Sequence, residues 1–191
     1  MQGESPMDIE LRGLGQALAI MDSLSANAPH ELAKAMNAAA NKGRSRAITR
    51  ITRGYFIDKG ATQGAITVKK AGGGNLEAII NVQSSPAALS KFNISPDYRP
   101  VGVRQTDGVM AQAKRSSGGK VLAHAFLVRF KSGHLGVIER KGSDRYPLKE
   151  LYGPSITGMV SADDNRLDIT QSIEEAANAA IEKALSTMMG G

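Results

Sequence analysis

The sequence predicts an α+β fold in which an antiparallel sheet built from hairpins is flanked by N-terminal helices and a C-terminal helix. Three observations lead to this prediction. Apolar residues recur every three or four positions towards both ends of the chain, which is typical of amphipathic helices. In the middle they alternate with polar residues, as in half-buried strands, and glycine-containing turns separate these strands into pairs.

The length of 191 residues suits one domain with an apolar core. We expect this single domain over residues 8–157, and a linker with a C-terminal helix over 158–191 that packs on the domain or extends from it. Hydrophobic residues make up 41% of the chain, but none of its apolar stretches is long enough to cross a bilayer. A soluble, cytoplasmic protein without a membrane partner is therefore expected.

The N-terminal part predicts two helices. The first, over roughly residues 8–25, has an apolar stripe formed by Leu11, Leu14, Leu18 and Met21. The second begins at Pro29, where the missing N–H costs nothing, and ends at Gly54. Its apolar residues face inward and its cations face outward, so the C-terminal half of this helix is a basic ridge.

The basic ridge and a later loop supply candidate contact residues. Residues 107–120 combine glycine, serine and cations without periodicity, which predicts a mobile loop. The candidates for contact with an acidic partner or with DNA are Arg44, Arg46, Arg50, Arg53, Lys114 and Arg115. A second interpretation stays open, in which the ridge is a solvated face whose cations complement the helix dipole.

Two hairpins are expected in the middle of the chain. The first has strands near 61–70 and 75–83 around a flexible Gly72–Gly74 tip, and the second has strands near 121–131 and 134–141. A short helical turn is expected near Pro86 to Phe92, followed by an extended segment, Val101 to Thr106. The glycine tip lacks the pattern of a phosphate-binding loop.

The last helix and the histidine of the second hairpin complete the prediction. Ser172 and Glu175 form a capping box, which predicts that the C-terminal helix begins there. Phe126, Val128 and Phe130 share one face of their strand. His124 falls on the same face and is expected at the edge of the core.

Nothing in the chain indicates catalysis. It has no cysteine, and its three histidines are not spaced as metal ligands. Glu139, Asp144 and His134 are close in sequence, but strand alternation places His134 and Glu139 on opposite faces. Glu139 and Asp144 are each next to an arginine, which is typical of an exposed hairpin end. We therefore expect no enzymatic activity, no cofactor and no metal.

The net charge of +6 is unevenly distributed. Residues 1–33 and 151–191 each carry about −4, whereas 34–70 carry about +8 and 111–150 about +6. This separation suits nucleic-acid binding. It suits equally a subunit whose acidic surface binds the basic surface of a neighbour.

The segment AFLVRFKSGHLGVIERKGSDRYPLKELYGPSI resembles the signature of the phage minor tail protein Z family. An aromatic-rich strand is followed by S-G-H-x-G-V, an arginine, a proline-led step and L-Y-G-P-S. The residues that carry this motif are Ser132, Gly133, His134, Gly136, Arg140, Pro147, Leu151, Tyr152, Gly153 and Pro154. The resemblance extends more loosely over residues 8–157, including Pro86, Leu89 and Phe92.

The resemblance implies a structural virion protein of a phage or prophage tail, acting in tail completion at the end that joins the head. Its expected partners are other tail proteins (tube, terminator or connector) and further copies of itself in a homo-oligomer or ring. It is expected in the virion tail, and in the host cytoplasm during assembly. The alternative is a non-enzymatic nucleic-acid-binding module that contacts the DNA backbone through the basic helix and loop. Only 4% aromatic residues leave few platforms for stacking single-stranded bases.

Overall fold

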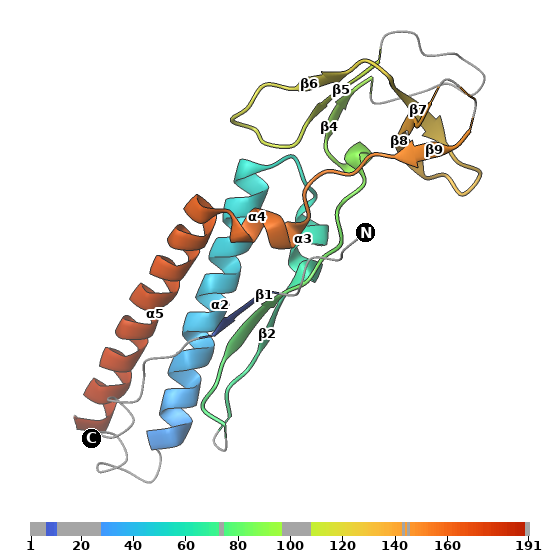
Figure 1. The fold of residues 1–191 in the computed structure, drawn as a ribbon. Coiled ribbons are helices and arrows are strands. Elements are labelled where there is room, and N and C mark those ends of the chain that lie inside the picture. The colour runs from blue at the N-terminus through green and yellow to red at the C-terminus, as the bar shows by residue number, and fades with distance from the viewer. Residues whose placement is uncertain are drawn as a thin grey trace.

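The structure is a computed structural model that describes residues 7–10, 28–72, 75–96, 108–142, 144 and 146–189. Two long helices, α2 (Ala28–Gly54) and α5 (Asp163–Met189), lie side by side, as Figure 1 shows. Their buried faces include Leu32 and Ile51 on α2 and Ile169 on α5. At the crossing, Gly43 allows a close approach, because a Cβ atom there would overlap with the side chain of Ile173.

A three-stranded antiparallel sheet lies along α2. Its strands β1 (Met7–Glu10), β2 (Ile66–Lys69) and β3 (Ile79–Val82) have the order β1-β3-β2. Ile66, Ile80 and Val82 face the helices and are fully buried. The short helices α3 (Lys59–Ala65) and α4 (Ile156–Ser161) pack near the end of α2 and extend this core.

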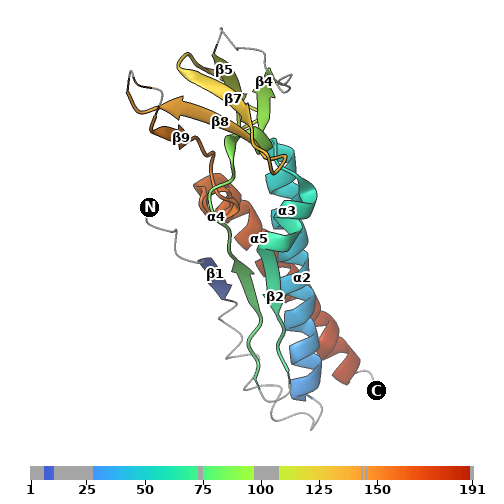
Figure 2. The same cartoon turned by 90° about the vertical axis from the view of Figure 1, so that its right-hand side faces the viewer.

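Two more three-stranded sheets lie at one end of the helices, as Figures 1 and 2 show. One contains β4 (Asn93–Ser95), β5 (Val109–Gln112) and β6 (Lys120–Leu122). The other contains β7 (Ala125–Arg129), β8 (Leu135–Arg140) and β9 (Leu148–Glu150). They enclose a second, smaller core, which consists of Ile94, Val109, Ala125, Leu127 and Val137. The 3-10 turn η1 (Leu89–Lys91) precedes β4.

The α+β prediction is confirmed, with helices α2 and α5 and antiparallel hairpins in the expected order. The β2–β3 and β7–β8 pairs are the two predicted hairpins. The helical turn near Pro86 to Phe92 is also present, as η1. In place of one antiparallel sheet, however, the described strands form three.

Several predicted boundaries are wrong. Residues 8–10 belong to strand β1, not to a helix, because they pair with β3; the remainder of the predicted 8–25 helix lies outside the described residues. Residues 61–65 belong to helix α3, which the Asp58 carboxylate caps by accepting from the Ala61 N–H at 2.8 Å. The segment predicted as extended over 101–106 is not described.

The segment predicted as a mobile loop, 107–120, contains strand β5 and the start of β6. β5 pairs with both β4 and β6. These backbone hydrogen bonds fix the segment as a strand, although its own sequence has no strand periodicity. Gly108 has a φ of +74°, and a Cβ atom there would lie 2.8 Å from the Leu122 carbonyl oxygen. Glycine in this segment therefore permits a tight strand pair.

The C-terminal helix begins at Asp163, well before the predicted capping box. Ser172 and Glu175 are inside the helix, and Gln171 donates a side-chain hydrogen bond to Glu175 at 3.1 Å. Asn165 lies in the first turn of this helix, and its side chain donates to the Met159 carbonyl at 2.7 Å, which links α5 to α4.

Candidate assembly surfaces

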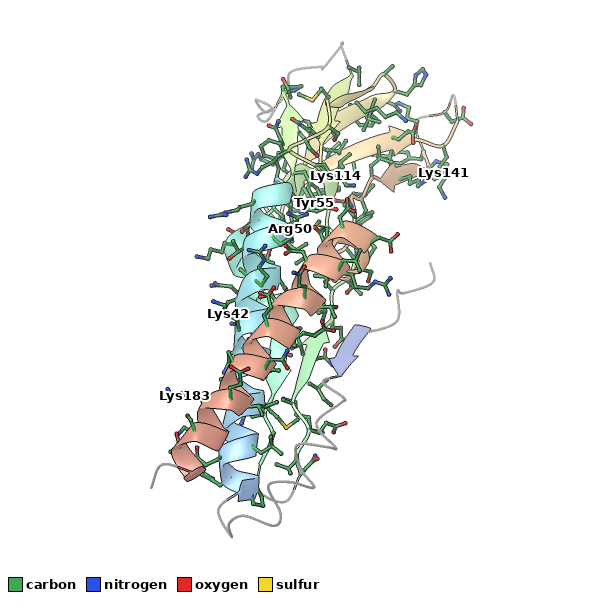
Figure 3. The ribbon with its side chains drawn as sticks, turned by 90° about the vertical axis from the view of Figure 1, so that its left-hand side faces the viewer. Lys42, Arg50, Tyr55, Lys114, Lys141 and Lys183 are labelled. Atoms are coloured by element: carbon green, nitrogen blue, oxygen red, sulfur yellow. The ribbon has the colours of Figure 1, made fainter. Side chains whose placement is uncertain are left out.

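A groove of about 380 Å³ lies where the C-terminal end of α2, the segment after β5 and the start of α5 meet. It brings together four of the six predicted contact residues: Arg46, Arg50, Arg53 and Lys114. Figure 3 shows Arg50, Tyr55 and Lys114 in succession towards the β-rich end. Tyr55, Ser116 and Asp164 also line this groove, which we call the basic groove.

Two of these arginines bond to α5 within the same chain. Arg46 donates to Asp168 from Nε at 2.7 Å and from Nη2 at 2.5 Å. The hydrogen bond and positive charge of Arg46 lower the pKa of the Asp168 carboxyl, and the same contact raises the pKa of Arg46. Arg50 donates from Nε to the Asn165 side chain at 3.0 Å. These contacts join α2 to the start of α5.

Arg44 and Arg115 do not line the basic groove. Arg44 donates to the carbonyl oxygens of Ile66 at 2.6 Å and Gln63 at 3.0 Å, so it holds the α3–β2 junction against α2. Arg115 donates to the Tyr55 carbonyl at 3.2 Å, and its guanidinium lies 4.1 Å from the centre of the Phe56 ring. Both residues connect elements of the fold, which charge alone in the sequence did not reveal.

A second groove, of about 460 Å³, follows the seam between α2 and α5. It includes Arg46 and Thr49, which also line the basic groove, and it carries both Lys42 and Glu175. The acidic C-terminal segment thus lies beside the basic helix of its own chain. Part of the charge separation seen in the sequence is compensated within the molecule, and Arg53 and Lys114 remain exposed at the β-rich end.

The family-motif histidine is part of a small cluster on the β7–β8–β9 sheet. Its ring stacks on Phe130, with centroids 5.5 Å apart, and its Nε2 lies 2.7 Å from Oε1 of Glu150. The Tyr152 hydroxyl donates to the other Glu150 oxygen at 3.2 Å, which raises the pKa of Tyr152. Glu150 was missed by the sequence analysis, because only the β8–β9 pairing brings it to His134.

Glu139 lies on the opposite face from this cluster, as predicted, since it pairs with the buried Ala125. The predicted place of His124 is wrong: it is exposed in the turn before β7. The core lies on the face of Ala125 and Leu127, and Phe126 and Val128 are on the other face. Alternation alone could not decide which face is covered, because both carry apolar residues.

The remaining motif residues shape the sheet and its connection to α4. Gly133 makes the β7–β8 turn with a φ of +86°. Gly153 lies against Phe92, whose ring would overlap with a Cβ atom at that position. The Arg140 guanidinium lies over the Phe126 ring. The Pro147 carbonyl accepts from the Lys141 N–H, and the Leu151 N–H donates to the Val137 carbonyl. Ser132 and Pro154 are exposed.

No group of three or more metal-ligating side chains occurs among the residues that the structure describes. Within the same residues, no helix is both long and apolar enough to span a membrane. The fold and its charged grooves define the class as an α+β protein with extended polar surfaces.

The family model described as "Prophage minor tail protein Z (GPZ)" matches residues 11–189, and the chain belongs to this family. The match continues through α5, beyond the range of the resemblance read from the sequence. No curated protein and no solved structure matches the chain significantly. The family makes the protein a structural component of a phage or prophage tail that interacts with other tail proteins.

Proposed function

We propose that the protein is a non-enzymatic tail-completion subunit at the head-proximal end of a phage or prophage tail. The sequence motif that ends in Leu-Tyr-Gly-Pro-Ser supports this role by its resemblance to the family. The observation that carries the proposed contact is the pair Arg53 and Lys114. Both are exposed and line the basic groove, at the junction between the helices and the β-rich end.

In this proposal, the basic groove binds an acidic surface of a neighbouring tail protein. The proposal treats helix α5 and the preceding chain as one domain, which is supported by Ile169 and Ile173 packing in the same buried cluster as Leu32 and Ile51. Attraction between exposed charges is weak for one pair, but it is repeated at each copy in a symmetric assembly.

The test is reversal of the two exposed cations, Arg53→Glu with Lys114→Glu, in a prophage that lacks its own copy of the gene. We expect a folded protein and a large loss of infectious particles. The matched control is Lys69→Glu with Lys70→Glu, which changes the charge equally at an exposed site on and after β2. Normal yields from the groove variant would refute the proposed contact.

Binding of the DNA backbone is the alternative, and the neighbouring carboxylates argue against it. Asp164 lines the basic groove and Asp168 pairs with Arg46, which leaves Arg50, Arg53 and Lys114 as the groove cations for phosphates. Phosphate contacts make affinity fall steeply with salt. Titration of the protein with labelled duplex DNA at two salt concentrations distinguishes the alternatives: tight, salt-dependent binding lost in the Arg53→Glu, Lys114→Glu variant would favour DNA.

A further inference from the structure

The outer face of the β7–β8–β9 sheet carries apolar side chains on the side away from the small core. Pairing of Phe126 with Ile138 and of Val128 with Gly136 places these four residues on one face, where Ile138 is already buried and Phe126 and Val128 are half-buried. Their neighbours in sequence, such as Leu127 and Val137, point the other way into the core. We call the first face the outer sheet face.

This face and its edge hold most of the exposed large apolar side chains in the described chain. Phe130 is 41% exposed, Leu148 38% and Tyr152 45%, and Tyr146, two residues before Leu148, is 66% exposed. Gly136 allows the group to gather, because a Cβ atom there would lie 3.0 Å from the Phe130 ring. Clustered exposed aromatic residues are typical of protein-binding surfaces.

The rim of the outer sheet face is basic. Lys131, Arg140 and Lys141 are exposed around it, against the exposed carboxylate of Asp144. The Glu150 carboxylate on the face is already bonded to His134 and Tyr152. A partner that covers the exposed apolar residues of this face and its edge should therefore carry acidic groups around an apolar contact.

The outward face of α5 has these properties. Leu167 is 65% exposed, and at 100° per residue the polar residues Asp163, Gln171, Glu174 and Asn178 lie within about 60° of it, together with the half-buried Ile181. The exposed acids of this face are Asp163, which forms an ion pair with Arg166 at 3.5 Å, Glu174 and Glu182, while Asp164 lies at its edge and lines the basic groove. Ile169, Ile173 and Ala184 are buried on the opposite side, against α2 and β3.

We propose that the outer sheet face of one copy binds the outward face of α5 on a second copy. Two sheet faces placed together would oppose their basic rims, whereas the acidic helix face complements them. A contact between two different surfaces is heterologous, and it produces a ring where the rotation closes. The biological role of such a ring depends on the proposed function in the tail. The contact between copies does not, because it can be measured with the isolated protein.

Sedimentation velocity of the full chain over a range of concentrations, at low and physiological salt, tests the contact. The sheet variant is Lys131→Glu with Lys141→Glu, and the helix variant is Glu174→Lys with Glu182→Lys. Each should weaken self-association by about tenfold or more, because reversal places like charges opposite one another. The two pairs combined in one chain restore opposite charges and should restore association. Lys69→Glu with Lys70→Glu is the control that should associate as the wild type does.

A wild type that stays monomeric, or a combined variant that associates no better than the single ones, overturns the proposal. If the outer sheet face instead binds a different tail protein, the sheet variant loses that binding while self-association is unchanged, which also overturns it. The proposed function is tested separately by Arg53 and Lys114. The combined variant could restore self-association while the Arg53→Glu, Lys114→Glu variant gives normal infectivity. That result would support the contact between copies and refute only the proposed role of the basic groove.

Discussion

The Arg46 guanidinium on α2 donates two hydrogen bonds to the carboxylate of Asp168 on α5, across 122 residues of sequence. This pair marks the point where the basic and acidic segments of the chain meet. Arg46 also lines both grooves. The cations of α2 therefore divide into those that hold the fold and those, such as Arg53, that stay exposed near the β-rich end.

The first prediction concerns Asp168, whose pKa is lowered chiefly by its hydrogen bond with Arg46. A carboxyl with a lowered pKa in the folded state stabilises the fold above its unfolded pKa of about 3.9, and this contribution disappears as pH falls through the folded pKa. The thermal stability advantage of the wild type over Asp168→Asn should thus be present at neutral pH and shrink in acid. In an Arg46→Ala background, the pH-dependent part of this advantage should be much smaller. An equal advantage at all pH values would contradict the argument.

The second prediction concerns Gly43, where α2 and α5 approach closely. Gly43→Ala should gain up to about 1 kcal/mol in helix propensity but lose about 1–3 kcal/mol through overlap with Ile173 and Ile80. We expect net destabilisation in urea unfolding. Gly64→Ala is the control, because a Cβ atom there has no neighbour within 4 Å. In the Gly43→Ala background, Ile173→Val should recover part of the lost free energy of unfolding, because it removes a methyl group from the overlap. A Gly43→Ala protein more stable than the wild type would contradict the prediction, because it would show that α2 and α5 can move apart at little cost.

The third prediction concerns Asn37, which bonds the backbone of the β2–β3 hairpin to α2. Its amide donates to the Ala71 carbonyl at 2.9 Å and accepts from the Ala71 N–H at 2.8 Å. Asn37→Ala leaves both backbone groups without this partner and should cost about 1–3 kcal/mol. Faster hydrogen exchange in residues 66–72 should accompany the loss. Asn41→Ala, at an exposed position one turn further along α2, should change neither measurement.

The fourth prediction concerns Tyr152, whose pKa is raised by its hydrogen bond to the Glu150 carboxylate. Removal of that negative charge in Glu150→Gln should lower the pKa of Tyr152 towards the ordinary value of about 10. The ultraviolet absorbance of tyrosinate during a pH titration measures this shift. Comparison with the Tyr152→Phe protein, which lacks this transition, identifies the part of the titration that belongs to Tyr152. An unchanged titration in Glu150→Gln would show that the hydrogen bond between Tyr152 and Glu150 is not formed in solution.

Sequence reasoning found the parts of the fold that depend on local periodicity. Helix α2 was predicted from Pro29 to Gly54, and the β2–β3 and β7–β8 hairpins were found from alternation around glycine turns. The motif from Ser132 to Ser155 was sufficient to indicate the family, which the family match confirms. These signals lie within short stretches, where neighbouring residues determine which side chains share a face.

Other features were decided only by contacts between distant segments. Strand β1 exists because it pairs with β3, and β5 because it lies between β4 and β6. The sequence shows that the segment from Arg44 to Arg53 is basic, but it does not show that Arg44 bonds to the Ile66 carbonyl or Arg46 to Asp168. Composition and periodicity determine the sign of a charge and its position along a helix. Which charges are paired depends on the element that packs beside them, and so only the tertiary structure distinguished Arg46, bonded to α5, from Arg53, exposed at the basic groove.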